Sequence, residues 1–240
     1  MKQHCKASIV FVVMLGLFLS LSPKVRAETL HLVTEEYPPL NMTNAYGQVV
    51  GSATELLRAA ANRINLVLDI RLLPWKRGYS ITQKTPSTCI YSTWRTEERE
   101  AQFIWVGPLA KDAWSFYARE DKDIELKSIE DTFDYRVGGV DGWGFTTHLQ
   151  ELGYPLLDLA PVEDIINAQK LISNRIQLWA TGRISGQQIL KEKKFKGIKE
   201  VFAIREIGLW VACNPLTDRN LLKKLQTSLD FIQKNNSNQN

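Results

Sequence analysis

The sequence has little histidine and little cysteine, three residues of each in a chain of 240. His31 and His148 are the only histidines beyond the N-terminal apolar segment, and neither lies at metal-ligand spacing from a cysteine, aspartate or glutamate. The G-x-S-x-G, H-E-x-x-H and phosphate-loop patterns are also missing. We therefore expect no metal, no cofactor and no catalytic residue, and we expect a protein that is not an enzyme.

Long apolar runs are missing too, with one exception near the N-terminus. Two lysines precede an apolar or small run over residues 7–21, which is too short for a membrane span. Val25 and Ala27 suit the −3 and −1 positions of a cleavage site, so residues 1–27 are predicted to be a signal peptide. Cys5 precedes the run, which excludes it as the lipid-bearing cysteine of a lipoprotein. We expect a soluble periplasmic protein.

The chain that remains after removal of the signal peptide has no excess of positive charge. Four cations leave with it, so 30 basic residues become 26, equal to the 26 acidic ones. The residues that leave are Lys2, Lys6, Lys24 and Arg26. A near-neutral chain gives no support for nucleic-acid binding.

Cys89 and Cys213 are the two cysteines that remain, and an oxidising compartment permits them to pair. If the strands that carry them are neighbours, a disulfide would close a very long loop and stabilise the fold by roughly 4–5 kcal/mol. Two buried free thiols are an equally good interpretation. The pairing stays open at this point.

Strands and helices alternate along the chain, which predicts an α/β fold with parallel sheets and crossover helices. Strands are expected at 30–34, 67–73, 89–94, 113–117, 135–140, 176–180, 200–205 and 207–213. Helices are expected at 53–64, 75–83, 145–152, 165–173, 186–192 and 218–233, with a further helix beginning after Thr96.

The segment around Thr96 carries the strongest chemical signal. Thr96 is a good N-cap residue, and Glu97 and Glu98 lie in the first turn, where a helix favours carboxylates. Free N–H groups at a helix start bind anions, and Arg99 adds a planar guanidinium that grips a carboxylate with two hydrogen bonds. The segment predicts an anion site, although an ordinary capped surface helix shows the same pattern.

Several motifs, in order, resemble the family 3 periplasmic solute-binding proteins, which are related to polar amino-acid receptors of ABC importers. They lie at 37–40 (YPPL), 47–51 (GQVVG), 73–75 (LPW), 95–100 (RTEERE) and 103–109 (FIWVGPL). The resemblance implies two α/β lobes, each with a mixed, mostly parallel sheet, joined by two crossing hinge strands. Lobe 1 is expected at 28–115 and 205–240, and lobe 2 at 116–204. The ligand is expected in the cleft between them.

The resemblance also implies roles for particular residues. Arg99 matches the arginine that holds the ligand carboxylate, and Thr96 matches its helix-start partner. Tyr37 matches a stacking aromatic, and Ser92 a position whose backbone meets the ligand ammonium. The turn Asp141-Gly142-Trp143-Gly144 resembles the second-lobe turn whose N–H groups complete the carboxylate site. A core tyrosine and a plain strand-to-helix turn are the alternatives.

The chain departs from the family pattern in two ways. The stretch after 176–180 has no aspartate for the ligand ammonium, and Asp141, Glu35 or Glu36 are the candidate replacements, none of them singled out. Trp94 and Trp143 add indoles where the family has smaller residues, and Trp75 is a further candidate wall residue. These tryptophans either shape an aromatic cleft or pack the lobes together.

The expected function is capture of a small carboxylate-bearing, amino-acid-like ligand for import, by a monomer that delivers it to a membrane permease. One alternative is a receptor that reports its ligand to a sensor protein. Another is a dehydratase-like enzyme that uses Glu35 or Glu36 as a general acid.

Overall fold

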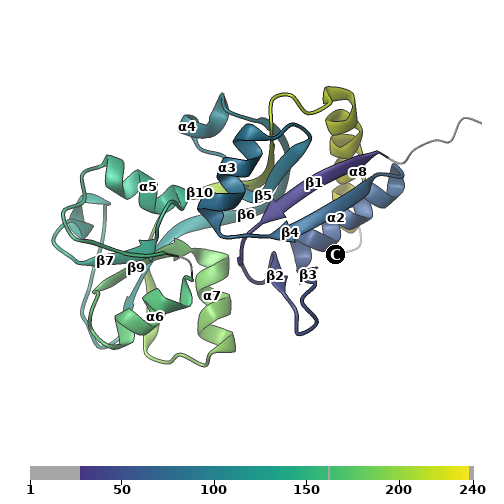
Figure 1. The fold of residues 1–240 in the computed structure, drawn as a ribbon. Coiled ribbons are helices and arrows are strands. Elements are labelled where there is room, and N and C mark those ends of the chain that lie inside the picture. Colours follow the sequence, from purple (N-terminus) through teal and green to yellow (C-terminus); the bar gives the residue numbers. More distant parts are fainter. Residues whose placement is uncertain (1–27, 162, 238–240) are drawn as a thin grey trace, which may run out of the picture.

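The computed structural model describes residues 28–161 and 163–237, so the predicted signal peptide lies outside the described residues. Two lobes lie side by side and are joined by two long strands (Figure 1). The elements in chain order are β1 (Thr29–Thr34), β2 (Met42–Thr43), β3 (Val49–Val50), α2 (Ser52–Arg63), β4 (Val67–Leu72), α3 (Trp75–Lys84), β5 (Thr88–Trp94), α4 (Glu97–Glu100), β6 (Ile104–Arg119), η2 (Glu130–Thr132), β7 (Val137–Val140), α5 (Gly144–Glu151), β8 (Leu157–Ala160), α6 (Ile165–Ile172), β9 (Leu178–Gly182), α7 (Arg183–Glu192), β10 (Ile198–Cys213) and α8 (Arg219–Ser237).

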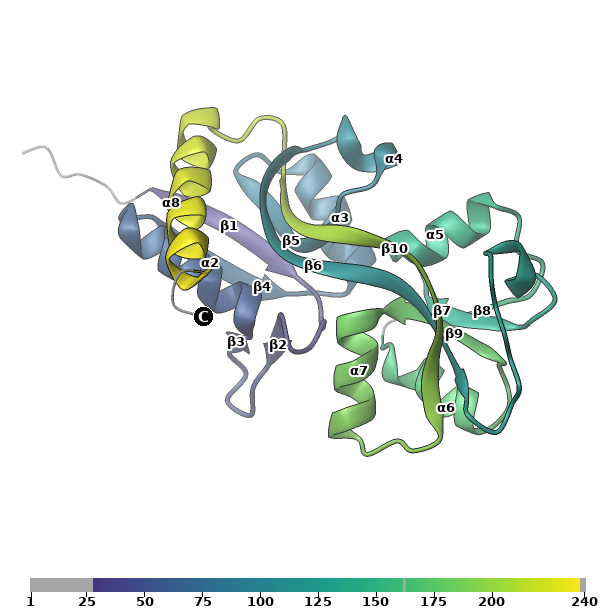
Figure 2. The same cartoon turned by 180° about the vertical axis from the view of Figure 1, so that it is seen from behind.

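One mixed sheet of eight strands, in the order β4-β1-β5-β10-β6-β9-β7-β8, runs through both lobes. Strand β1 pairs in parallel with β4 and β5 in the first lobe, and β7 pairs in parallel with β8 and β9 in the second. Strands β6 and β10 are antiparallel to each other and cross from one lobe to the other (Figure 2). This arrangement confirms the predicted α/β class. The predicted lobe boundaries fall within β6 and β10 and remain a proposal.

Strands β6 and β10 are each 16 residues long, much longer than the sequence pattern predicted. The separate strands predicted at 200–205 and 207–213 are one continuous strand. Polar residues such as Lys111, Asp112 and Glu206 interrupt the apolar pattern in both strands. The pattern fails where the strands pass between the lobes, because Lys111 of β6 and Arg205 and Glu206 of β10 are exposed there.

Helices α2 and α8 pack together on one face of the first-lobe strands, and α3 covers the other face (Figures 1 and 2). The apolar stripe of α2 buries Leu57, Ala60 and Ala61. The Ser228 hydroxyl of α8 donates to the Ala60 carbonyl at 2.9 Å, which fixes the two helices against each other. Over residues 28–161 and 163–237, no helix is both long and apolar enough to cross a bilayer.

A disulfide joins Cys89 in β5 to Cys213 at the end of β10. The two residues are direct partners in the antiparallel ladder between these strands. Both are fully buried in the first-lobe core. The bond therefore ties the end of the second crossing strand to the centre of the first lobe.

Candidate functional site

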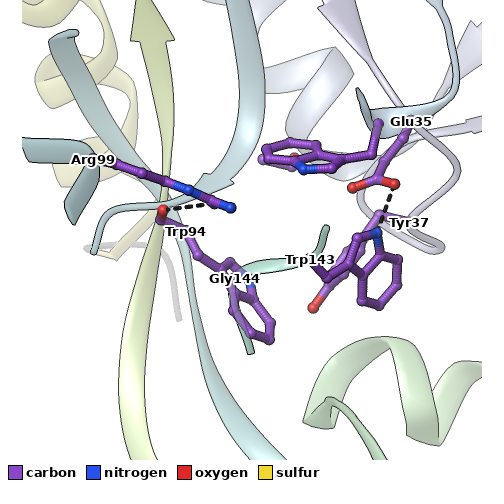
Figure 3. A pocket seen from close by; sticks show the side chains of 8 residues that line it. Glu35, Tyr37, Trp94, Arg99, Trp143 and Gly144 are labelled. Atoms are coloured by element: carbon purple, nitrogen blue, oxygen red, sulfur yellow. Dashed lines mark hydrogen bonds between the residues drawn. The ribbon is translucent and has the colours of Figure 1, made fainter. Parts of the chain in front are cut away.

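A small cavity lies between the lobes, lined by the loop after β1, by α3, β5 and α4, and by the start of α5; Figure 3 shows its side chains. Its volume is about 20 Å³. The lining residues are Glu35, Tyr37, Trp75, Ser92, Trp94, Arg99, Trp143 and Gly144. The cavity thus brings together most of the predicted site residues with Glu35, one of the three carboxylates that the sequence left open.

Arg99 is a buried cation without a carboxylate partner. Its side chain is 8 % exposed, and no ion pair within 4.0 Å is found for it among the described residues. Its guanidinium donates two long hydrogen bonds, each of 3.4 Å, to the carbonyls of Trp94 and Gly142, and lies over the Trp75 and Tyr79 rings, 5.0 and 5.3 Å from their centroids. Burial lowers the pKa of Arg99 from its ordinary value. An incompletely satisfied buried cation is costly, so this site favours an anion.

The N-terminus of α5 lies against the Arg99 guanidinium. Helix α5 begins at Gly144 after the N-cap residue Trp143, and it has no side-chain cap. A Cβ atom at Gly144 would lie 3.4 Å from Arg99 Nη1, so the absence of a side chain permits this close approach. The first N–H groups of a helix have no intrahelical acceptors. Guanidinium and helix start together bring hydrogen-bond donors and positive charge to one point, an arrangement that suits an anion.

Ser92 adds a polar group that is directed at no protein partner. It lies within β5 but has a φ of 56°, a left-handed conformation that is uncommon for serine. Its hydroxyl is buried, and no hydrogen-bond partner is found for it in the described part of the chain. Unpartnered buried hydroxyls in a cavity wall are available to a bound molecule.

Glu35 provides the carboxyl group at the end of the cavity opposite Arg99 (Figure 3). Its Oε2 atom accepts a hydrogen bond of 2.7 Å from the Trp143 indole. The residue as a whole is partly exposed, but its carboxyl group is surrounded by protein. Burial raises the pKa of Glu35 to about 8, although the Trp143 hydrogen bond and the Arg99 charge oppose the shift. The carboxyl group is therefore mainly protonated at neutral pH.

The two other candidate ammonium partners lie outside the cavity. Asp141 forms an ion pair with Lys76 at the surface. Glu36 is exposed and accepts a hydrogen bond from the Thr43 backbone at 3.0 Å. Of the three carboxylates that the sequence left open, Glu35 is the one that faces Arg99.

We expect Glu35 to make folding stability depend on pH. Because its pKa is raised to about 8 from 4.5, the folded protein keeps a proton that the unfolded chain releases above pH 4.5. Its contribution to the free energy of unfolding is fully present below pH 4.5 and is lost as the pH rises to 8, by at most about 1.4 kcal/mol per pH unit. Urea denaturation should show a stability difference between wild type and Glu35→Gln that falls from pH 5 to 8. Glu36→Gln, at an exposed position, should show no such trend, and an equally flat profile for Glu35→Gln would contradict the prediction.

Tyr37 and Asp112 lie against Gly182, the last residue of β9. The Tyr37 hydroxyl donates to Asp112 at 2.7 Å, and Asp112 also accepts a hydrogen bond of 3.0 Å from the Ile184 backbone at the start of α7. A Cβ atom at Gly182 would collide with both side chains. The space that a side chain at position 182 would need is therefore filled by the pair from the first lobe and β6. The sequence analysis did not identify Asp112.

Three of the predicted site residues lie outside the cavity wall. Thr96 is the N-cap residue of α4, but its side chain makes no capping bond, and α4 has only four residues. The anion site at this short helix start stays a prediction, and the structure adds the free N–H groups at the start of α5 beside Arg99. Gly142 contributes a carbonyl to Arg99, and Asp141 lies at the surface.

The aromatic residues form the walls of the cavity. Trp75 lies against Tyr79, with ring centroids 5.4 Å apart, and Trp94 lies against Trp114 at 5.1 Å. The Trp143 ring lies 5.3 Å from the Tyr37 ring across the gap between the lobes. Each of these tryptophans lines the cavity and packs against a neighbouring ring, and its role toward a ligand stays a prediction.

Known proteins share both the sequence pattern and the fold. The model of the bacterial extracellular solute-binding proteins, family 3, matches residues 30–240, which confirms the resemblance inferred from the motifs. A histidine kinase sensor domain with similarity to periplasmic binding proteins has a TM-score of 0.80 at 21% identity, over 88% of this chain and 93% of that chain. The arginine-bound form of truncated ArgBP from T. maritima has a TM-score of 0.73 at 15% identity, over 85% and 96%.

An ABC uptake transporter substrate-binding protein from Streptococcus pneumoniae, with bound histidine, has a TM-score of 0.76 at 13% identity, over 86% of this chain and 87% of that chain. At these levels of identity the similarities establish the fold. No curated protein matches the chain significantly.

Proposed function

The chain belongs to the bacterial extracellular solute-binding proteins of family 3, and from this premise we propose that it captures a small carboxylate-bearing, amino-acid-like ligand in the cleft between its lobes. The observation that carries the proposal is Arg99, a buried cation that has no carboxylate within ion-pair distance among the described residues. We propose the periplasm as the place of action and import through an ABC-type permease as the purpose.

The two ends of the cavity suit the two ends of an amino acid. The ligand carboxylate would lie between the Arg99 guanidinium and the first turn of α5, where both donate hydrogen bonds. The ligand ammonium would lie at Glu35 and release the proton that burial keeps on that carboxyl group. Trp75 and Trp94 would cover the faces of the ligand, and Ser92 would supply a further polar contact.

A thermal-shift screen of residues 28–240 tests the proposal. Amino acids and other small carboxylates should stabilise the protein, by about 2.7 kcal/mol for a ligand present at 100 times its dissociation constant. For a chain of this size that corresponds to a rise in Tm of roughly 5–10 °C. Polyamines and the amides of the same acids, which lack the anion, should give no shift. A shift with polyamines alone would contradict the carboxylate assignment.

Two alternatives use the same cleft. In the first, ligand-induced closure is read by a sensor partner, and co-purification with a permease or with a kinase would separate import from sensing. In the second, the Glu35 carboxyl group, protonated at neutral pH and opposite the carboxylate anchor, acts as a general acid. Loss of an acid on incubation with the protein, absent with Glu35→Gln, would indicate catalysis.

A further inference from the structure

An open groove lies on the outside of the first lobe, between the end of α2 and the helix α8. Its volume is about 680 Å³. Helices α2 and α8 lie side by side on the part of the first lobe that is turned away from the second lobe (Figures 1 and 2). A molecule bound in this groove would therefore leave the cleft between the lobes accessible.

Among the residues that the structure describes, three cations line the groove and no carboxylate does. Arg63 is the last residue of α2, and Lys223 and Lys224 lie in α8. All three are exposed. None of them has a carboxylate within 4.0 Å in residues 28–161 and 163–237. Positive charges that converge without neutralisation create a potential that attracts anions.

The acidic residues near the groove do not cancel this potential. The Asp218 carboxylate accepts a hydrogen bond of 2.7 Å from the Asn220 N–H, and Asp230 accepts one of 2.7 Å from Gln226. The first turn of α8 contains Arg219 and no acidic residue. Because the N-terminal end of a helix dipole is positive, α8 adds to the positive potential of the groove.

The groove also has an apolar rim. The Phe231 side chain is 48% exposed, and the Arg63 guanidinium lies 3.8 Å from the centre of its ring. The half-buried Ile64 lines the same groove. Cations beside an exposed aromatic ring are typical of surfaces that lie at a membrane interface, where the charges meet anionic headgroups and the ring meets the acyl boundary.

The lysine-rich turn after α7, in the second lobe, lacks this combination. Lys193 and Lys194 are exposed there. However, Glu120 and Asp121 line the neighbouring hollow together with Lys196. Because carboxylates are repelled by an anionic surface, this end of the molecule is the poorer docking surface. It supplies a matched control with the same number of lysines.

We propose that the groove between α2 and α8 docks the protein on a membrane surface that carries anionic phospholipids. Arg63, Lys223 and Lys224 contact the phosphate oxygens of the headgroups, and the Phe231 ring lies at the level of the glycerol groups. The docked first lobe holds the protein beside a membrane partner while the cleft stays accessible. This docking does not depend on which ligand the cleft binds.

Co-sedimentation of residues 28–240 with lipid vesicles tests the proposal. Vesicles of phosphatidylglycerol and phosphatidylcholine in about equal amounts should bind the protein, whereas phosphatidylcholine alone should not. Binding should weaken steeply as the salt concentration rises from about 0.1 M to about 1 M, because the Debye length falls from about 10 Å to about 3 Å. Absence of binding to the anionic vesicles would overturn the proposal and favour an acidic protein surface as the occupant. Equal binding to both kinds of vesicle would overturn it as well, since charge would then not be recognised.

A pair of double variants locates the docking surface. Lys223→Ala/Lys224→Ala should bind the anionic vesicles about 25-fold more weakly, because each lysine near an anionic surface contributes about fivefold. Lys193→Ala/Lys194→Ala removes the same charge and should bind as the wild type does. Equal losses in the two variants would show that binding follows net charge alone, and would overturn the assignment to the groove.

Inorganic phosphate distinguishes a membrane surface from a free anion. Added at constant ionic strength, phosphate should leave vesicle binding unchanged, since a single small ion cannot replace several headgroups together with the contact of the Phe231 ring. Displacement of the protein from the vesicles under these conditions would identify a site for free phosphate and would overturn membrane docking. Thermal unfolding of both double variants should match the wild type, because all four lysines are exposed.

Discussion

Replacement of Arg99 by alanine is expected to abolish ligand binding while the protein remains folded. The guanidinium is the buried cation of the cleft, and removal of one member of a desolvated, charge-assisted pair costs about 2–5 kcal/mol. That range corresponds to roughly 30- to 4,000-fold weaker binding. Isothermal titration with an acid identified by thermal shift measures the loss directly. An unchanged dissociation constant would refute the assignment of Arg99 as the carboxylate anchor.

Arg95→Ala is the matched control for this experiment. Arg95 pairs with Glu100 and lies against the Trp210 ring, outside the cavity, so its loss should leave ligand affinity unchanged. Arg99→Met adds a second test, because methionine keeps the apolar stem and removes the charge. Since no carboxylate lies within ion-pair distance of Arg99 in residues 28–161 and 163–237, Arg99→Met without ligand should be at least as stable as the wild type without ligand. Lower stability would indicate that Arg99 serves the fold as well as the ligand.

Removal of the disulfide is expected to cause the largest loss of stability. Cys89 and Cys213 are 124 residues apart, and in the chain-entropy model a loop of that length stabilises the folded state by about 5 kcal/mol. The double variant Cys89→Ala/Cys213→Ala should therefore unfold roughly 10–20 °C below the wild type. Differential scanning calorimetry measures the difference.

A reductant provides the control for the disulfide. In denaturant titrations with dithiothreitol, the wild type should fall to the stability of the double variant, whereas the double variant should not respond. If the wild type has the same midpoint with and without the reductant, the two cysteines do not form a stabilising bond in solution.

The first-lobe elements from β1 to β5 could be predicted because each one carries its own apolar pattern. The apolar stripe of α2 and the uniformly buried residues of β5 are visible in the sequence alone. The full length of β6 and β10 could not be predicted, because their middle residues lie between the lobes and some of them carry charges. Local pattern predicts an element only where one side of it faces a core.

The candidate site shows the same distinction. Arg99 could be selected from the sequence because its signal is local, an N-cap residue and an acidic first turn around one arginine, and its role as carboxylate anchor stays a prediction. The environment of Glu35 depends on a tryptophan 108 residues away, and Asp112 meets Tyr37 across 75 residues. Such contacts exist only after the lobes have approached each other. The environments of Glu35 and Asp112 therefore cannot be predicted from the sequence of any single segment.

The continuous ladder between β6 and β10 has a mechanical consequence. Because the strands of both lobes belong to one sheet, the cleft opens by bending that sheet rather than by parting two separate bodies. The ladder is irregular between Glu200 and Phe202 and between Ala203 and Arg205, and such positions bend most easily because they lack regular pairing. We expect the resistance of the sheet to bending to be lowest at these positions. A substitution at these irregularities should change the angle to which the lobes open, while the contacts of Arg99 and Glu35 stay the same.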